Sequence, residues 1–247
     1  MTKDYYSEQY WGKSPPRADL EEREKKSLSL LLKKTASRRQ TFLDLGCGDG
    51  CFLFSTALLD PKLELFGIDA SETQLKKAQK RLPQGRFSHG NFESQLPYES
   101  NSFDLIFSGE ILEHIEDTDH FISEAHRVLA PGGMLCITTP NLLAWYNRVF
   151  IACGMSPLFV EYSTKDASVG YGILRARKEK TPVGHLRIFH PRAVVDLLSK
   201  CGFRICSVHA AEFTALPRWM RVIDRIISRC LPNAGSISIV CAEKLKS

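Results

Sequence analysis

From Thr41 onward, short runs of apolar and β-branched residues alternate with longer amphipathic stretches. Because parallel strands need long crossover connections, this alternation predicts a doubly wound, mostly parallel α/β sheet of seven strands. The predicted strands are 41–45, 63–68, 86–89, 103–107, 134–138, 203–209 and 236–242. The predicted helices are 51–58, 71–82, 117–129, 142–154, 192–201 and 216–231. The last two strands have no obvious classical crossover between them, which predicts an antiparallel edge.

Two regions depart from this alternation. Residues 1–40 form an N-terminal extension, predicted as a flap followed by a helix at about 18–34. The extension is either a helix packed on the flank of the sheet or an aromatic flap that closes over the active site. Within the main domain, 41–247, the segment 140–190 is long and holds four glycines. A long irregular stretch in a compact domain predicts an inserted lid or a linker.

The composition is that of an ordinary globular chain, with 43% apolar and 25% charged residues among 247. No apolar stretch approaches the length of a membrane-spanning helix. The first twelve residues lack the basic start and apolar middle of a signal peptide, so we expect a cytoplasmic protein. The net charge of +5 is mild and the charges alternate along the chain, so no nucleic-acid partner is expected.

The eight cysteines contain no C-x-x-C pair and no repeated spacing. This pattern predicts neither a zinc site nor a disulfide framework. Most of the cysteines lie inside apolar runs, where a thiol in a reducing compartment behaves as a small hydrophobic group. We therefore predict core thiols.

A glycine-rich turn gives the strongest chemical signal in the chain. The sequence Leu43-Asp44-Leu45-Gly46-Cys47-Gly48-Asp49-Gly50 follows the first predicted strand and opens the first helix. Ligands of open parallel sheets bind at this carboxyl end of the strands, and glycine lets the backbone come into contact with them. Asp69 ends the second predicted strand, where a carboxylate can accept two hydrogen bonds from a ribose diol.

A nicotinamide dinucleotide would also bind its ribose through Asp69. The sequence of the turn therefore has to distinguish a dinucleotide from S-adenosylmethionine. The dinucleotide fingerprint is G-x-G-x-x-G, whereas this turn is spaced Gly46-x-Gly48-x-Gly50 and has Cys51 at the third glycine position. Asp44 and Asp49 also place negative charge beside the turn, which disfavours a diphosphate. S-adenosylmethionine carries a sulfonium and an ammonium group and no phosphate, so the charges favour it.

A set of motifs, in a fixed order, resembles those of the class I S-adenosylmethionine-dependent methyltransferases of the type 11 group. The resemblance covers about 42–139. The motifs are the D-x-G-x-G-x-G turn, Gly67-Ile68-Asp69, Gly90-Asn91-Phe92, Phe103-Asp104-Leu105-Ile106, Ile111-Leu112-Glu113-His114 and Arg127-Val128-Leu129-Ala130-Pro131-Gly132-Gly133. The resemblance implies a Rossmann-like fold, with S-adenosylmethionine as methyl donor and S-adenosylhomocysteine as product.

The resemblance also implies which residues hold the donor. Asp44 and the turn would hold the methionine part, and Asp69 the ribose hydroxyls. Asn91, an amide where many relatives have an aspartate, and Phe92 would contact the adenine, and Ala70 would lie beside it. Residues 108–110 would line the methyl-transfer face. The full set of implied donor-binding residues is Asp44, Leu45, Gly46, Cys47, Gly48, Gly50, Asp69, Ala70, Asn91, Phe92, Ser108, Gly109 and Glu110.

His114 is the candidate catalytic residue, because a histidine just past the fourth strand could accept a proton from a phenol or an alcohol. The alternative is that it packs against the following helix. Glu110 and His114 could also share a divalent cation, but two ligands do not define a site, so no metal is predicted.

The acceptor side is less clearly marked. Glu110, Tyr146, His185 and Arg187 are the candidate substrate contacts, the last two because a closing lid would deliver them. For Tyr146 a place in the core is the alternative. The helix 216–231 has Trp219 and isoleucines on one face and arginines largely away from it. It could rest on an anionic membrane surface, but we expect its apolar face to cover the sheet or a partner subunit.

These observations predict a methyltransferase acting on a small-molecule acceptor, with an oxygen on a sugar, lipid or aromatic ring as the first choice, in a monomer or homodimer. Three alternatives stay open. They are a nicotinamide-dependent dehydrogenase, a catalytically idle adapter with the same fold, and a protein or RNA methyltransferase. Methyl transfer from a sulfonium requires mainly alignment and exclusion of water, so a dedicated base is optional.

Overall fold

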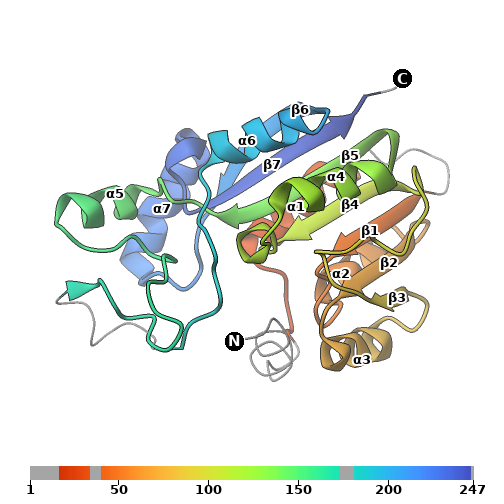
Figure 1. The fold of residues 1–247 in the computed structure, drawn as a ribbon, viewed down its shortest axis with the longest axis horizontal. Helices are drawn as coiled ribbons and strands as arrows, with labels where there is room; N and C mark the ends of the chain where they lie inside the picture. Colours follow the sequence, from red (N-terminus) through yellow and green to blue (C-terminus); the bar gives the residue numbers. More distant parts are fainter. Residues whose placement is uncertain (1–16, 34–39, 173–180, 246–247) are drawn as a thin grey trace.

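A computed structural model describes residues 17–33, 40–172 and 181–245 of the chain. Its centre is one seven-stranded sheet with the order β3-β2-β1-β4-β5-β7-β6 (Figure 1). The strands are β1 (Thr41–Leu45), β2 (Glu64–Asp69), β3 (Arg86–His89), β4 (Phe103–Gly109), β5 (Leu129–Pro140), β6 (Phe203–Ala211) and β7 (Ile237–Lys244). The predicted fold class is confirmed.

The first five strands are parallel to their neighbours, and β7 runs antiparallel to both β5 and β6. The predicted antiparallel pair at the edge is therefore present. β7 is the second strand from this edge of the sheet, and β6 is the edge strand. β5 is longer than predicted, since the Pro131-Gly132-Gly133 segment belongs to the strand in place of ending the preceding helix.

Helices cover both faces of the sheet (Figure 1). They are α1 (Glu22–Leu32), α2 (Cys51–Leu59), α3 (Glu72–Arg81), α4 (Thr118–Val128), α5 (Trp145–Ala152), α6 (Pro191–Lys200) and α7 (Arg218–Cys230). One buried cluster joins the sheet to α4 and α6 through side chains such as Phe121 and Leu198. A second cluster joins it to α1 and α2 through Leu28 and Phe52. Burial of these apolar side chains is the main force that holds the two layers on the sheet.

The N-terminal extension is described from Arg17. Its helix α1 begins at Glu22 with a capping box in which Glu21 and Glu24 each bond the other's backbone. Leu28 and Leu31 are buried against the sheet. This helix therefore packs on a face of the sheet, which was the first of the two alternatives. The aromatic part of the predicted flap lies outside the described residues, and its role as a flap stays a prediction.

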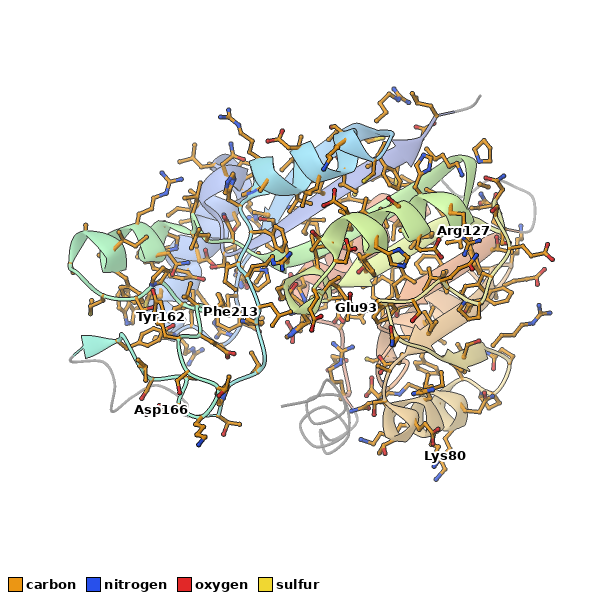
Figure 2. The ribbon with its side chains drawn as sticks, viewed as in Figure 1. Lys80, Glu93, Arg127, Tyr162, Asp166 and Phe213 are labelled. Atoms are coloured by element: carbon orange, nitrogen blue, oxygen red, sulfur yellow. The ribbon has the colours of Figure 1, made fainter. Side chains whose placement is uncertain are left out.

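The segment between β5 and α6 contains α5 and a series of turns. Phe159 packs edge-on against Phe213 with a centroid distance of 5.0 Å, which joins this segment to the connection between β6 and α7. Figure 2 shows Tyr162, Asp166 and Phe213 together at this end of the molecule. Whether the segment moves as a lid stays a prediction.

The helix α7 contradicts one expectation. Its buried residues are the polar Asp224 and Ser228, whereas Trp219 is 66% exposed and Ile226 is 58% exposed. Asp224 accepts hydrogen bonds from the Ser236 hydroxyl and from the backbone N–H of Phe213. Polar contacts dock the helix, so its apolar face does not cover the sheet, and the alternative that it covers a partner subunit stays a prediction.

Candidate functional site at the carboxyl edge of the sheet

The carboxyl ends of β1, β2 and β4 lie side by side. Leu45 pairs with Ile68 of β2 and with Ser108 of β4. The turn after β1 therefore lies between Asp69 on one side and the residues after Ser108 on the other. This is the edge at which open parallel sheets bind ligands.

The glycine turn is anchored to β2 and held in a shape that requires glycine. The backbone N–H groups of Gly46 and Cys47 donate to the Ile68 carbonyl at 2.8 and 3.1 Å. Gly46, Gly48 and Gly50 all have positive φ. A Cβ at Gly46 would overlap the Ile111 side chain, whereas a Cβ at Gly48 would meet no atom within 4 Å. Gly46 is therefore fixed by packing, and Gly48 faces open space in which a ligand fits.

Asp69 links this turn to the start of α3. Its Oδ2 accepts a hydrogen bond from the Gly48 N–H at 2.8 Å, and its Oδ1 accepts one from the Ser71 N–H at 2.8 Å. Ser71 in turn caps α3 by accepting from the Gln74 N–H. The two backbone bonds thus hold the Asp69 carboxylate in a fixed orientation at the tip of β2.

Asp44 and Asp49 differ in their surroundings. Asp49 accepts a hydrogen bond from the Arg17 N–H at 2.6 Å and pairs with Arg81 at 3.1 Å. Asp44 is 2% exposed and has no hydrogen-bond or ion-pair partner among the residues that the structure describes. Burial raises the pKa of the Asp44 carboxyl well above its usual range, and the nearby Glu24 adds to this effect. The expected negative charge of Asp49 is thus offset by two arginines, whereas the charged form of Asp44 is disfavoured unless a cation lies beside it.

A cationic ligand fits these observations better than a phosphate. A buried carboxylate without a partner is costly, and an ammonium group would compensate it. A diphosphate at the same turn would face this carboxylate at short range. The donor set therefore fits the ammonium and ribose groups of S-adenosylmethionine.

The predicted adenine side is less enclosed. Ala70 is half-buried, and its carbonyl lies 3.0 Å from the His89 ring nitrogen. Asn91 is exposed, and its Oδ1 accepts from the Glu93 N–H at 2.7 Å. Phe92 is buried, with its ring edge-on to Phe121 in the core cluster. The structure thus places these residues near the tips of β2 and β3, and their contact with adenine stays a prediction.

Residues after β4 line the other side of the turn. The Ser108 hydroxyl is fully buried and has no hydrogen-bond partner within the described ranges. Glu110 has φ +57°, a strained conformation for a side chain of this kind. Its Oε1 accepts from the Thr138 hydroxyl at 3.1 Å and lies 3.8 Å from the Arg23 Nε. Burial raises the pKa of the Glu110 carboxyl, and Arg23 opposes that shift.

The sequence interpretation missed the contribution of the N-terminal helix to this site. Arg17 pairs with Glu24 at 2.7 Å, and Arg23 reaches Glu110 from the same segment. Glu24 is 4% exposed. No residue pattern in the chain distinguishes these charges from those of a solvated helix face, so only the structure could find them.

His114 and His185 come together, although they lie 71 positions apart in the sequence. Their ring centroids are 4.9 Å apart. The Nδ1 of His114 bonds the Gly184 carbonyl at 3.1 Å, and the Nδ1 of His185 bonds the Phe159 carbonyl at 2.9 Å. Burial lowers the pKa of His114 to about 4, so this imidazole is neutral at pH 7.

Other predicted acceptor contacts are placed differently. Tyr146 is 1% exposed and packs with Ala144 and Leu216 in a separate apolar cluster, the core placement that was its alternative. Arg187 is exposed, and its guanidinium donates to the Glu116 carbonyl at 3.1 Å. Neither placement adds support for a contact with the acceptor. Glu113, which was not selected, is fully buried beside the two histidines.

Comparisons with known proteins agree with this geometry. A family model described as a methyltransferase domain matches residues 36–166. A probable S-adenosylmethionine-dependent methyltransferase of Mycolicibacterium smegmatis is 32% identical over 103 residues, covering 42% of this chain and 39% of the relative. Trans-aconitate 2-methyltransferase of Variovorax paradoxus is 31% identical over 131 residues, covering 53% of this chain and 50% of the relative. These matches span half or less of the curated relatives.

Among solved structures, a S-adenosylmethionine-dependent methyltransferase of Methanosarcina mazei aligns with a TM-score of 0.62 at 20% identity. The alignment covers 93% of this chain and all of that one, which supports the same fold. The family match, the sheet order and the turn at its carboxyl edge lead to one conclusion. The chain belongs to the methyltransferase domain family and has the fold of the class I S-adenosylmethionine-dependent methyltransferases.

Proposed function

We propose that this protein transfers a methyl group from S-adenosylmethionine to a small-molecule acceptor. The observation that carries the proposal is the buried Asp44 carboxyl beside the glycine turn, which has no hydrogen-bond or ion-pair partner among the described residues. It is an anionic position at the edge where the sheet binds ligands, next to a second carboxylate, Asp69, that is already oriented by the turn. A positively charged nucleoside without phosphate matches both features.

When bound, S-adenosylmethionine supplies an activated methyl group on a positively charged sulfur. The chain's own residues bind and orient it. In the proposal, Asp44 compensates the ammonium group and Asp69 accepts the ribose hydroxyls, while the open face of Gly48 leaves room for the ligand backbone. Ser108 and Glu110 border the side on which the methyl group is transferred. There the half-buried Glu110 carboxyl and the edge of the sheet limit access of water.

The proposed acceptor is an oxygen on a sugar, a lipid or an aromatic ring. His114 and His185 support this choice, because their rings lie together beyond the end of β4 and the His114 imidazole is neutral at pH 7, so it can accept a proton from a hydroxyl group. A small-molecule acceptor also agrees with the relative that is named trans-aconitate 2-methyltransferase.

Titration of the purified protein with S-adenosylmethionine tests the donor assignment. We expect the wild-type chain to bind the donor and its product S-adenosylhomocysteine, and not NAD. An Asp44→Asn variant should bind the donor about 10-fold more weakly, the size expected when a charged hydrogen-bond partner becomes neutral. The same variant should be more stable than wild type in the absence of ligand, because the raised pKa shows that the folded state disfavours the charged form.

Asp104→Asn is the matched control, because Asp104 binds the backbone and hydroxyl of Thr41 and lies away from the turn. Calorimetry should give the same donor affinity for this control as for wild type. Binding of NAD in preference to the donor would favour a dehydrogenase. Failure to bind either ligand would favour an adapter and would overturn the proposal.

We also propose that α7 contacts an anionic membrane surface. Its exposed apolar residues Trp219, Val222, Ile223 and Ile226 follow the i, i+3, i+4, i+7 spacing of one helical face. Arg218 and Arg229 are exposed and have no ion pair among the described residues. An amphipathic helix with an aromatic residue and flanking arginines is typical of surfaces that lie in the interfacial layer of a bilayer. Within the described ranges, no helix combines the length and the apolar character that crossing a membrane requires.

Co-sedimentation with vesicles tests this contact. The protein should sediment with vesicles that contain phosphatidylglycerol and much less with phosphatidylcholine alone, and added salt should weaken the binding. A Trp219→Ser/Ile226→Ser variant should lose most of the binding. Leu58→Ser/Leu59→Ser, which removes two equally exposed apolar side chains of α2, is the control. Concentration-dependent dimerisation that the α7 variant abolishes, without vesicle binding, would show a second copy as the occupant instead.

A further inference from the structure

Three potential metal ligands converge beside the methyl-transfer side of the site. A carboxylate oxygen of Glu113 and one ring nitrogen each of His114 and His185 all lie within 4.8 Å of one another. Glu113 and His114 belong to the short helical turn Leu112–His114 after β4, and His185 belongs to the segment between α5 and α6. The cluster thus forms only when the chain is folded, from two parts far apart in the sequence.

Glu113 is the buried member of the cluster. Its side chain is fully buried, and its Oε2 accepts from the Thr139 hydroxyl at 3.0 Å. Its Oε1 is buried and has no hydrogen-bond partner in the described part of the chain. A buried carboxylate oxygen without a partner is costly unless a proton or a cation compensates it. This oxygen is the second observation, independent of the clustering, that indicates a ligand.

Both histidines are oriented in the way that metal-binding histidines are. The Nδ1 of His114 lies 3.1 Å from the Gly184 carbonyl, and the Nδ1 of His185 lies 2.9 Å from the Phe159 carbonyl. A carbonyl oxygen can only accept, so each Nδ1 carries the hydrogen and each Nε2 carries the lone pair. A backbone carbonyl that fixes the tautomer of a ligating histidine is the usual outer partner of a metal site.

The surrounding backbone holds His185 against the helical turn. The Glu161 carboxylate accepts hydrogen bonds from the N–H groups of Val183, Gly184 and His185 at 2.7 to 3.2 Å. The Glu113 carbonyl accepts one from the Leu186 N–H at 2.9 Å. These bonds fix the loop on both sides of His185, so the position of this ring is part of the folded structure.

We propose that Glu113, His114 and His185 bind a divalent transition-metal ion, and that Zn²⁺ is the ion that this donor set fits best. Two imidazoles and one carboxylate are a common donor set for zinc sites that keep a position open. Mg²⁺ prefers oxygen ligands and retains several waters, so it fits poorly. A tetrahedral zinc site places its ligand atoms about 3.3 Å apart, so each ligand has to move by less than about 1 Å.

This inference rests on the proposed function and makes it more specific. Glu110 accepts from Thr138 and Glu113 accepts from the adjacent Thr139, so both carboxylates lie at the end of β5. In the proposal, an open coordination position at this end takes an oxygen of the acceptor. It assigns His114 the role of a ligand in place of the base expected from the sequence. Coordination lowers the pKa of a bound hydroxyl, which removes the need for a dedicated base.

Metal binding by the full chain is measured without reference to activity. After dialysis against a chelator under reducing conditions, wild-type protein should take up one equivalent of Zn²⁺, and excess Mg²⁺ should not compete. Co²⁺ in the same site should show the visible absorption of a nitrogen and oxygen environment. Glu113→Gln, His114→Gln and His185→Gln should each weaken Zn²⁺ binding at least about 10-fold.

His209→Gln is the control, because His209 lies on β6 and outside the cluster. Zinc binding that persists in the His185→Gln variant, or a sulfur-to-cobalt charge-transfer band, would show adventitious binding by a cysteine and overturn the proposal. Absence of Zn²⁺ uptake by the wild-type chain would overturn it as well. Thermal unfolding and donor titration are recorded for every variant. A folded wild type that binds the donor but no metal refutes this inference alone, whereas loss of donor binding refutes the proposed function.

Discussion

An Asp69→Ala variant should bind S-adenosylmethionine at least about 100-fold more weakly than wild type, which corresponds to about 3 kcal/mol for the loss of two hydrogen bonds to a carboxylate. The structure gives a further reason for a large effect. Asp69 also accepts from the N–H groups of Gly48 and Ser71, so its removal releases the turn as well as the predicted ribose contacts. Isothermal calorimetry with the donor and with S-adenosylhomocysteine measures the change.

An Asp69→Asn variant separates the two contributions, because its amide oxygen can still accept one of the backbone bonds. We expect its affinity to lie between those of wild type and the Ala variant. Methylthioadenosine keeps the ribose but lacks the amino acid part. Its affinity should fall in the Asp69→Ala variant as much as that of the donor, and should be unchanged in the Asp44→Asn variant. Equal affinity of wild type and Asp69→Ala for the donor would remove the ribose assignment.

A Gly46→Ala variant should lose about 3 kcal/mol of folding free energy. A left-handed backbone costs an alanine about 1 to 2 kcal/mol, and the overlap with Ile111 adds about 1 to 3 kcal/mol. Because the turn connects β1 to α2, any relief of this overlap displaces the donor site too. Urea unfolding followed by circular dichroism gives the change in stability.

Gly48→Ala is the matched variant two residues away. Its φ of +51° costs a similar amount for the backbone, but the new methyl group would meet no atom of the protein. We therefore expect a stability loss of only about 1 kcal/mol together with weakened donor binding, since the methyl group occupies the space assigned to the ligand. If Gly48→Ala binds the donor as tightly as wild type, the ligand does not lie against this face of the turn.

The sheet and the donor turn could be predicted from local patterns. The strands 41–45 and 63–68 are short, largely apolar runs followed directly by Gly46 and Asp69, and a buried parallel strand has few other sequence forms. The turn could be predicted as well, because glycines at fixed spacing after a strand indicate a backbone with positive φ, which other residues rarely adopt. Ser71 as the cap of α3 was predictable for the same local reason.

Features that depend on contacts between distant segments were not predictable. Asp49 looked like free negative charge, but Arg17 and Arg81 neutralise it. Each arginine lies 32 positions from Asp49, one before it and one after it in the sequence. The amphipathic pattern of 216–231 showed correctly that a helix forms, but the pattern does not state which face meets the protein. Three polar contacts at Asp224 decided that orientation, and each comes from a different segment.

The placement of β7 between β5 and β6 affects how the molecule is built. Cys136 and Cys241 face each other across β5 and β7 although 105 residues separate them. During synthesis, β5 and β6 therefore emerge before the strand that joins them exists, while the half that holds the donor turn can already assemble. Closure of so distant a pairing is slow. A nascent chain therefore exposes the unpaired margin of β5 until β7 has been synthesised.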